Sequence, residues 1–273
     1  MKTFYLSFIF LTIFSCRVHA QDTIYLEKYV GNLKKVNVTI GSNSYSLLFD
    51  TGGGETFISP EIANSLEKTI YGSTTGFRMS GEAIKYRKSD SVSFNIGGTT
   101  IFHPSLGVWD IMSILPKDFP KLDGILSLKS FPDKILSLDL ANNKIILETS
   151  SSYRKLIKKK KPLPSRFANG PDGNELTIFL GIPMQKRLYW FLFDSGNLND
   201  LLFSHNTAYE WGLESDTISQ RQQFGAVNIS IGIKKFTTEA ASEAIIYDGS
   251  LNFAILSKST FIINFLKKQV WIY

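Results

Sequence analysis

The sequence contains few of the residues that build metal centres and disulfide scaffolds. It has one cysteine and three histidines among 273 residues, and it has no His-Glu-x-x-His motif. This scarcity excludes a disulfide framework or a thiolate metal cage and argues against a zinc hydrolase. A Gly-x-Ser-x-Gly elbow and a complete phosphate-binding loop are also missing, so a serine hydrolase and a P-loop enzyme are not favoured. We therefore expect no metal and no cofactor.

Long apolar runs are also missing after the first twenty residues, so we expect no stable membrane span. Lys2, the apolar run Phe4–Phe14 and the small-residue pattern Val18-His19-Ala20 together predict a signal peptide at 1–20. The mature protein is expected to be secreted or periplasmic. Two alternatives stay open. Ile13-Phe14-Ser15-Cys16 resembles a lipobox, which would make the protein a lipoprotein anchored at Cys16, or residues 1–20 remain as an anchor.

The net charge of +6, from 30 Lys and Arg against 24 Asp and Glu, is unevenly placed. Lys2 and Arg17 belong to the predicted signal peptide. Six further basic residues lie between Arg154 and Lys161, and the rest of the chain is about neutral. Serine and proline residues flank this run, which favours a solvated basic linker at 151–171 over a docking strip for an anionic polymer or lipid. No interleaved aromatic module surrounds it, so no nucleic-acid partner is expected.

The two halves on either side of this linker resemble each other. In each half an alternating strand turns into a second apolar strand that ends in an aspartate followed by Thr-Gly or Ser-Gly. These strand pairs are Val36–Ile40 with Ser46–Gly52, and Leu176–Leu180 with Tyr189–Gly196. The repeat predicts two lobes of the same frame, at 21–150 and 172–273.

The ends of the halves also correspond. Leu122-Asp123-Gly124-Ile125-Leu126 matches the region of Asp248-Gly249-Ser250-Leu251, and the final strands Lys144–Leu147 and Gln269–Ile272 follow at the same spacing. The connections before the Asp-Gly elements are shorter in the second half. Similar frames with trimmed loops indicate duplication followed by divergence.

These motifs resemble those of the aspartic peptidases of the pepsin and retropepsin kind, and the resemblance covers essentially the whole mature chain. Phe49-Asp50-Thr51-Gly52 and Phe193-Asp194-Ser195-Gly196 look like the two catalytic motifs. The resemblance implies a secreted, bacterial-type member with an all-β, two-lobed double β-barrel (an acid-protease fold) and short helices. It further implies a hydrolase, an aspartic-type endopeptidase that acts on an extended peptide or protein substrate.

Asp50 and Asp194 are the predicted catalytic residues. Two carboxylates held close together share one proton, so that one takes a proton from water while the other polarises the substrate carbonyl. The hydroxyls of Thr51 and Ser195 are expected to hydrogen-bond across the lobes. Site-supporting glycines, Gly52 and Gly196, allow the opposite loop to come near. Because one chain carries both motifs, we expect a monomer.

The first half contains a longer connection at 74–88 that predicts a hairpin flap over the cleft, with an ordinary surface hairpin as the alternative. The candidate flap residues are Phe77, Met79, Ser80 and Gly81. The aromatic side chains of Phe77 and Tyr86 are candidates for a place near the site.

Three departures from the family pattern bear on activity. Gly53-Gly54 removes the small polar side chains usual after the first motif, Asn197–Asp200 is an unusual continuation of the second, and Ser250 replaces an apolar residue. A non-catalytic peptide-binding or scaffold protein with the same fold is therefore the alternative function. His103, which precedes Pro104, is expected to end a strand instead of binding a ligand.

Overall fold

The computed structural model describes residues 21–170, 173–184, 187–213 and 220–273. The predicted signal peptide and Cys16 lie outside the described residues. Within the part of the chain that is described, no helix is long and apolar enough to cross a membrane.

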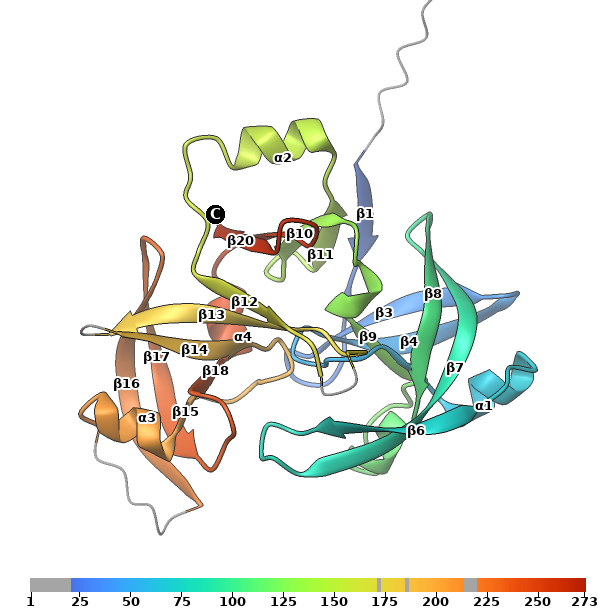
Figure 1. The fold of residues 1–273 in the computed structure, drawn as a ribbon, viewed down its shortest axis with the longest axis horizontal. Coiled ribbons are helices and arrows are strands. Elements are labelled where there is room, and N and C mark those ends of the chain that lie inside the picture. The colour runs from blue at the N-terminus through green and yellow to red at the C-terminus, as the bar shows by residue number, and fades with distance from the viewer. Residues whose placement is uncertain (1–20, 171–172, 185–186, 214–219) are drawn as a thin grey trace, which may run out of the picture.

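The first lobe is one eight-stranded sheet with the order β2-β3-β4-β9-β5-β8-β7-β6 (Figure 1). An additional pairing of Thr39 on β3 with Asn95 on β7 closes six of these strands into a barrel. The strand bounds are β2 Glu27–Lys28, β3 Lys34–Ile40, β4 Asn43–Asp50, β5 Phe57–Ile58, β6 Tyr71–Phe77, β7 Ala83–Ile96, β8 Thr99–Val108 and β9 Gly124–Ser127.

The second lobe repeats this plan with seven strands in the order β12-β13-β14-β18-β15-β17-β16. Strands β13 and β16 lie near each other, so this barrel is nearly closed. The strand bounds are β12 Ser165–Ala168, β13 Thr177–Met184, β14 Arg187–Phe193, β15 Leu201–Ser204, β16 Arg221–Ile231, β17 Lys234–Glu243 and β18 Gly249–Leu251. The all-β, two-lobed fold expected from the sequence is confirmed.

A third sheet, of five strands, joins the two lobes. Its order is β1-β11-β10-β19-β20, so a hairpin from each half meets at the antiparallel pair β10 and β19. The bounds are β1 Asp22–Tyr25, β10 Ile135–Asp139, β11 Lys144–Leu147, β19 Phe261–Asn264 and β20 Gln269–Ile272. The sequence repeat predicted the outer strands of both hairpins but not that they share a sheet.

The helices are short. They are α1 Pro60–Ser65, α2 Ser150–Leu156, α3 His205–Glu210 and α4 Phe253–Leu256, with 3-10 turns η1 Ile111–Ser113 and η2 Leu128–Ser130. Serine, threonine or asparagine caps the first turn of each α-helix; Ser59, for example, accepts a hydrogen bond from the backbone of Ile62.

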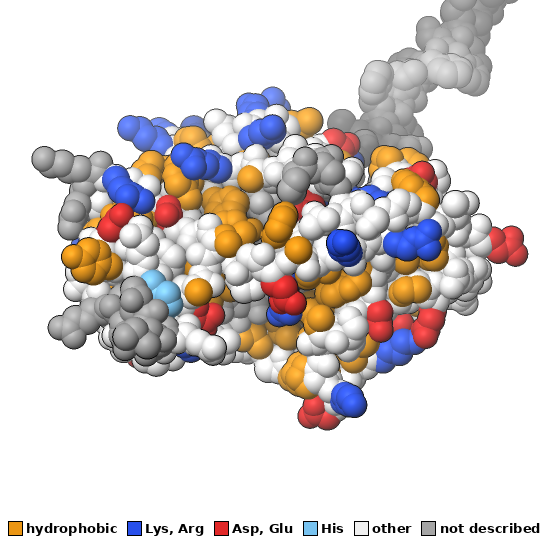
Figure 2. Space-filling view, turned by 60° about the horizontal axis from the view of Figure 1, so that its bottom comes forward, with side chains coloured by type: hydrophobic (Ala, Val, Ile, Leu, Met, Phe, Trp, Pro, Cys, Tyr) orange, Lys and Arg blue, Asp and Glu red, His pale blue; other side chains and the backbone are white. Residues whose placement is uncertain are grey.

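The expected linker at 151–171 is largely ordered structure. It contains most of α2 and all of β12, which is a strand of the second lobe's sheet. Tyr153 on α2 packs edge-to-face on Trp271 of β20, with ring centroids 5.5 Å apart. Leu156 and Ile157 pack on the same small cluster, so the apolar residues among the basic ones cover part of the central sheet. On the face shown in Figure 2, basic side chains are scattered among acidic, polar and apolar ones.

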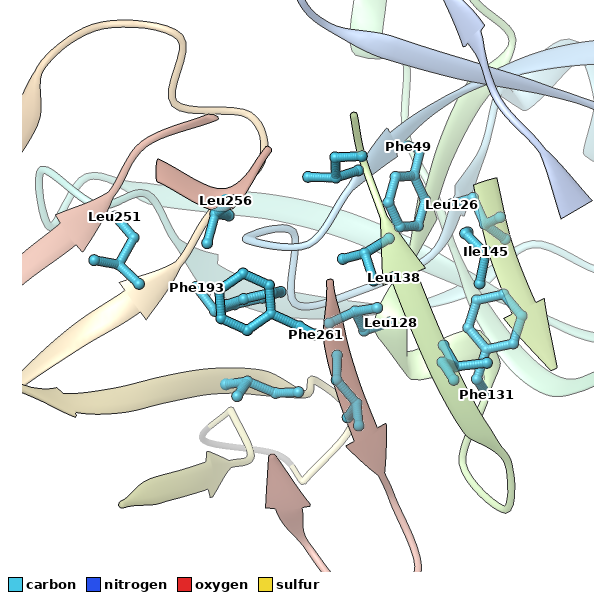
Figure 3. Packing of buried hydrophobic residues seen from close by; sticks show 14 of the residues in the cluster. Phe49, Leu126, Leu128, Phe131, Leu138, Ile145, Phe193, Leu251, Leu256 and Phe261 are labelled. Carbon is cyan, nitrogen blue, oxygen red and sulfur yellow. The ribbon is translucent and has the colours of Figure 1, made fainter. Parts of the chain in front are cut away.

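One apolar core runs through all three sheets. Figure 3 shows Phe49 of the first lobe and Phe193 of the second on either side of the central strands, with Leu138 and Phe261 between them. The Phe193 and Phe261 rings meet at 4.9 Å. Because Phe49 and Phe193 each precede a motif aspartate, this packing fixes the ends of the two motif strands relative to each other.

Candidate active site

The two motif aspartates stand at corresponding places in the lobes. Strand β4 ends at Asp50, and β14 ends one residue before Asp194. Each of these strands pairs in parallel with the strand of the matching Asp-Gly element, β9 in the first lobe and β18 in the second. Because a strand lies on both sides of each motif strand, the loop after each aspartate is held on a rigid base.

Thr51 and Ser195 join the two motif loops. The Thr51 hydroxyl donates a hydrogen bond to the Phe193 carbonyl at 2.7 Å and accepts one from the Ser195 backbone at 2.8 Å. In return, the backbone of Thr51 donates to the Ser195 hydroxyl at 3.1 Å. Both side chains are buried, so these bonds are shielded from water and lock the loops together.

The structure brings the carboxyl groups of Asp50 and Asp194 within hydrogen-bonding reach of each other. Asp50 also accepts from the Gly52 backbone at 2.9 Å, and Asp194 from the Gly196 backbone at 2.8 Å. A Cβ atom on Gly52 would lie 2.5 Å from the Asp194 carboxyl, and one on Gly196 would lie 3.0 Å from Asp50. Glycine at these positions leaves the room that the opposite carboxyl group occupies.

The carboxyl pair holds a proton at neutral pH. Burial raises the pKa of Asp50 above its ordinary value. Burial, together with the negative charge of Asp50, raises the pKa of Asp194 to about 8. Two carboxylates at this separation cannot both ionise easily, so ionisation of one favours a proton on the other.

Ser250 approaches the second aspartate, a contact that the sequence did not suggest. Its hydroxyl lies 3.4 Å from Asp194 Oδ2, a long and weak hydrogen bond. The sequence pattern indicated only that Ser250 replaces an apolar residue. Because β14 and β18 pair in parallel with Leu192 opposite Ser250, the replacement places a donor beside the second motif.

The candidate flap residues lie at the end of the β6–β7 hairpin. Phe77 is the last residue of β6, while Met79, Ser80 and Gly81 form the turn. The turn reaches the second lobe, where the backbone of Ile246 donates a hydrogen bond to the Met79 carbonyl at 3.0 Å. In Figure 1 the hairpin extends from the first lobe toward the second. It therefore bridges the two lobes.

Of the two candidate aromatic residues, Tyr86 is the buried one. Its side chain is 3% exposed, whereas Phe77 is 48% exposed. Tyr86 lies on the returning flap strand and donates a hydrogen bond to Glu175 of the second lobe at 3.2 Å. Glu175 lies beside Gly54 and Gly76, and the sequence did not identify it because no local motif marks it.

A buried ion cluster stands behind the first motif. The Glu55 carboxylate, which is 1% exposed, pairs with Lys88 of the flap strand β7 and with Lys129 of η2 at 2.8 Å. Glu55 also accepts a hydrogen bond from the backbone of Thr56 at 2.9 Å. Burial lowers the pKa of Lys129. The cluster joins the motif loop to the base of the flap.

A hydroxyl network continues from this cluster to His103. The Thr56 hydroxyl contacts Ser127 at 3.0 Å and Ser130 at 2.7 Å, and Ser130 contacts His103 at 2.9 Å. Burial lowers the pKa of His103 to about 4, so the ring is neutral at pH 7. His103 lies inside β8 instead of ending it, which corrects the expectation from the sequence. Among the described residues no cluster of three or more His, Cys, Asp or Glu is arranged to hold a metal.

The two lobes and the aspartate that each contributes define a fold of the aspartic-peptidase type. A sequence model described as aspartyl protease matches residues 36–129, which contain the first motif and its Asp-Gly element. The resemblance to the pepsin and retropepsin kind of aspartic peptidase is thus confirmed for the fold and for the first motif region.

Two solved seed proteins have a similar fold. Basic 7S globulin from soybean superposes with a TM-score of 0.55 at 8% identity, over 92% of this chain and 94% of the globulin. Conglutin gamma, a basic 7S globulin from lupine seeds, gives a TM-score of 0.54 at 8% identity, over 93% of this chain and 95% of conglutin gamma. A search of curated protein sequences finds no match. At this identity the likeness shows the fold alone.

Proposed function

We propose that this protein is an aspartic-type endopeptidase that hydrolyses an extended peptide. The observation that carries the proposal is the meeting of Asp50 and Asp194, one from each lobe, with their carboxyl groups within hydrogen-bonding reach of each other. Such a pair supplies a general base and a general acid at the same place, which is what water attack on an amide needs.

The chemistry follows from the sharing of one proton by the two carboxyl groups. Water placed between the carboxyls gives a proton to ionised Asp50 while its oxygen attacks the amide carbon. Protonated Asp194 gives its proton to the carbonyl oxygen, which yields a neutral tetrahedral diol. Asp50 then gives its proton to the amide nitrogen while Asp194 takes a proton from a diol hydroxyl. The carbon–nitrogen bond breaks to leave a carboxylic acid and an amine, and the pair returns to its singly protonated state. The hydrogen bonds through Thr51 and Ser195 keep both carboxyls in position throughout.

The test is peptide cleavage by the purified protein between acidic and neutral pH, with Asp50→Asn and Asp194→Asn as variants. Either substitution keeps the size of the side chain but removes one acid–base group, so cleavage is expected to fall by about 10²–10⁴-fold or more. Asp133→Asn is the matched control, because Asp133 is exposed and pairs with its neighbour Lys134 at 3.3 Å. Cleavage that survives at the wild-type rate in either motif variant contradicts the mechanism.

A non-catalytic peptide-binding or scaffold protein is the second candidate. Gly53 and Gly54 supply no side chain to orient the first carboxyl, and the two seed proteins of similar fold are named as globulins instead of peptidases. This candidate predicts that peptides bind but are not cut. Tight binding of a library peptide with no product across the pH range, in a protein whose fold is intact, favours it over catalysis.

We further propose that the mature protein is a secreted or periplasmic monomer. The proposal rests on the signal-peptide pattern of residues 1–20 and on the presence of both motifs in one chain. Mass spectrometry of the protein from its own cell type tests it. A mature chain that begins at Gln21 supports secretion, whereas a chain that begins at a lipid-modified Cys16 identifies a lipoprotein. Light scattering of the same sample gives the oligomeric state.

A further inference from the structure

The side chain of Glu175 lies in space left by three glycines, two of the first lobe and one that follows β12 of the second. A Cβ atom on Gly54, after the first motif, would lie 3.1 Å from the Glu175 Cβ. A Cβ on Gly76 of β6, the first strand of the flap hairpin, would lie 2.6 Å from Glu175 Oε1. A Cβ on Gly170 would lie 2.5 Å from Glu175 Oε2. These three segments come from different parts of the chain. Their glycines together make a cradle for one carboxylate.

The carboxylate is held in this cradle from both lobes. Leu176, the next residue, donates its backbone hydrogen bond to the Gly54 carbonyl at 2.8 Å. Tyr86 donates its hydroxyl to Glu175 at 3.2 Å, and its ring packs edge-to-face on Phe57 at 4.9 Å. Because the Tyr86 ring is buried and fixed, the bond ties the flap strand β7 to the second lobe.

The tip of the flap makes a second tie. The hydrogen bond from Ile246 to the Met79 carbonyl and the 3.0 Å approach between Ile246 and the Cβ position of Gly81 bring the turn onto the second lobe. The hairpin is therefore held at its tip by a backbone bond and along its returning strand by Glu175. A flap that is held at two points opens only when both bonds break.

We propose that Glu175 is a positioning residue that latches the flap hairpin closed through Tyr86. The proposal accounts for Gly54, whose missing side chain is a departure from the family pattern and is needed here for the approach of Glu175. Its consequence for catalysis rests on the proposed function, since a closed flap excludes water and clamps the bound peptide. The latch itself is a property of the fold and can be measured without turnover.

Amide hydrogen exchange on the purified protein tests the latch. The reporters are the amides of Gly81, bonded within the turn, and of Ile246, bonded across the lobes. Tyr86→Phe and Glu175→Ala remove the donor and the acceptor, so both amides are expected to exchange about two- to tenfold faster, the effect of one hydrogen bond of ordinary net strength. Glu175→Gln keeps an acceptor oxygen of the same reach and is expected to stay near the wild-type rate.

Tyr71→Phe is the matched control. Tyr71 lies on the other strand of the same hairpin, and its hydroxyl donates to exposed Asp90 on β7 instead of to the second lobe. It is expected to leave the Ile246 amide unchanged. Gly76→Ala gives an independent check, because its Cβ would lie 2.6 Å from Glu175 Oε1 and displaces the carboxylate. It should speed exchange in the wild type and have a smaller effect in Glu175→Ala, where only the 3.3 Å approach to the Tyr86 ring remains. Equal exchange at Ile246 in Tyr86→Phe, Glu175→Ala and Tyr71→Phe would overturn the latch.

Peptide turnover supplies a second, separable readout. With an active protein, kcat/KM is expected to fall about two- to tenfold in Tyr86→Phe and in Glu175→Ala, with no greater loss in the double variant, because both remove the same bond. If the wild type cleaves no peptide, the proposed function fails while the exchange measurement still decides the latch. If turnover is present but unaffected by either substitution while exchange accelerates, the role of the latch in catalysis is overturned and the closed flap is structural only.

Discussion

Asp194 links the proton of the site to the stability of the fold. Its pKa is raised from 3.8 to about 8, so between these values the folded protein holds a proton that the unfolded chain releases. The contribution to the free energy of unfolding is full below about pH 4 and is lost as the pH rises through about 8. Asp194→Asn removes this titration. We expect its melting temperature to gain on the wild type as the pH rises from about 4 to about 9, by about 2–4 °C for each kcal/mol relieved.

Calorimetry across this pH range measures the effect. Asp133→Asn is the control, because its exposed carboxyl group should give a melting temperature that follows the wild type at every pH. A constant difference between Asp194→Asn and the wild type, independent of pH, contradicts the raised pKa.

The Thr51 hydroxyl, which belongs to the first lobe, makes two hydrogen bonds to the second lobe. Thr51→Val keeps the shape of the side chain but leaves the Phe193 carbonyl and the Ser195 amide without their partner in a buried place. A cost of about 1–3 kcal/mol in the free energy of unfolding is expected for each buried group left unsatisfied. Urea denaturation measures it. Thr237→Val, which removes an exposed hydroxyl bonded to Asn228 at 2.7 Å, should cost much less, and an equal loss in both variants counts against the role of Thr51.

The residues of the site that the sequence identified are the ones with local motifs. Asp50 and Asp194 are marked by the strands before them and the glycines after them, and the repeat places them in equivalent positions. Glu175 carries no such signal, because its neighbours Gly54 and Gly76 are close only in the folded chain. In the sequence, Gly53-Gly54 indicated only that two side chains usual after the first motif are missing. The structure shows that the Glu175 side chain lies next to Gly54.

At the scale of elements, the base of the flap depends on the buried cluster around Glu55. Glu55→Gln removes the negative charge between Lys88 of β7 and Lys129 of η2 and leaves two buried or partly buried ammonium groups uncompensated. Breaking a buried pair in this way is expected to lower the free energy of unfolding by about 3–5 kcal/mol. Release of protons from the two lysines offsets part of this loss. Urea denaturation at pH 7 gives the value.

The control for this substitution is Glu27→Gln. Glu27 pairs with Lys35 at 3.2 Å, and the two side chains are 53% and 26% exposed, so the loss of the pair should cost less than about 1 kcal/mol. If the Glu55 and Glu27 variants unfold at the same urea concentration, the cluster does not anchor the hairpin.

The alternation of apolar and polar residues, together with turn residues, predicted the strands well where one face of the strand is buried. The strand expected at Val36–Ile40 is β3, with buried and less buried residues in turn, and the strand expected at Gln269–Ile272 is β20. The segment at 151–171 was different, because its charges and prolines favoured a linker. The helix α2 forms there through the Thr149 cap and the packing of Tyr153, and β12 forms because β13 offers it an edge. Such tertiary partners override a local preference.

At the scale of the whole molecule, the central sheet makes the two halves depend on each other. In the middle of this sheet, β10 from the first half pairs with β19 from the second, Leu136 standing opposite Ile263. The sequence indicated a duplication, but a repeat by itself does not say whether its copies fold separately or share a sheet. The structure shows a shared sheet, and Leu138 and Phe261, both fully buried, lie at its centre.

This arrangement predicts that neither half folds alone. A chain of residues 21–160 lacks β19, and its strand β10 then exposes Leu136 and Leu138 together with unpaired backbone groups. A chain of residues 161–273 exposes Phe261 and Ile263 in the same way. We expect each half alone to show weak near-UV circular dichroism and no sharp thermal transition, whereas the two halves refolded together should form a heterodimer that regains both. Two lobes that each unfold cooperatively on their own contradict this, because the central sheet is then a contact between independent domains instead of part of one core.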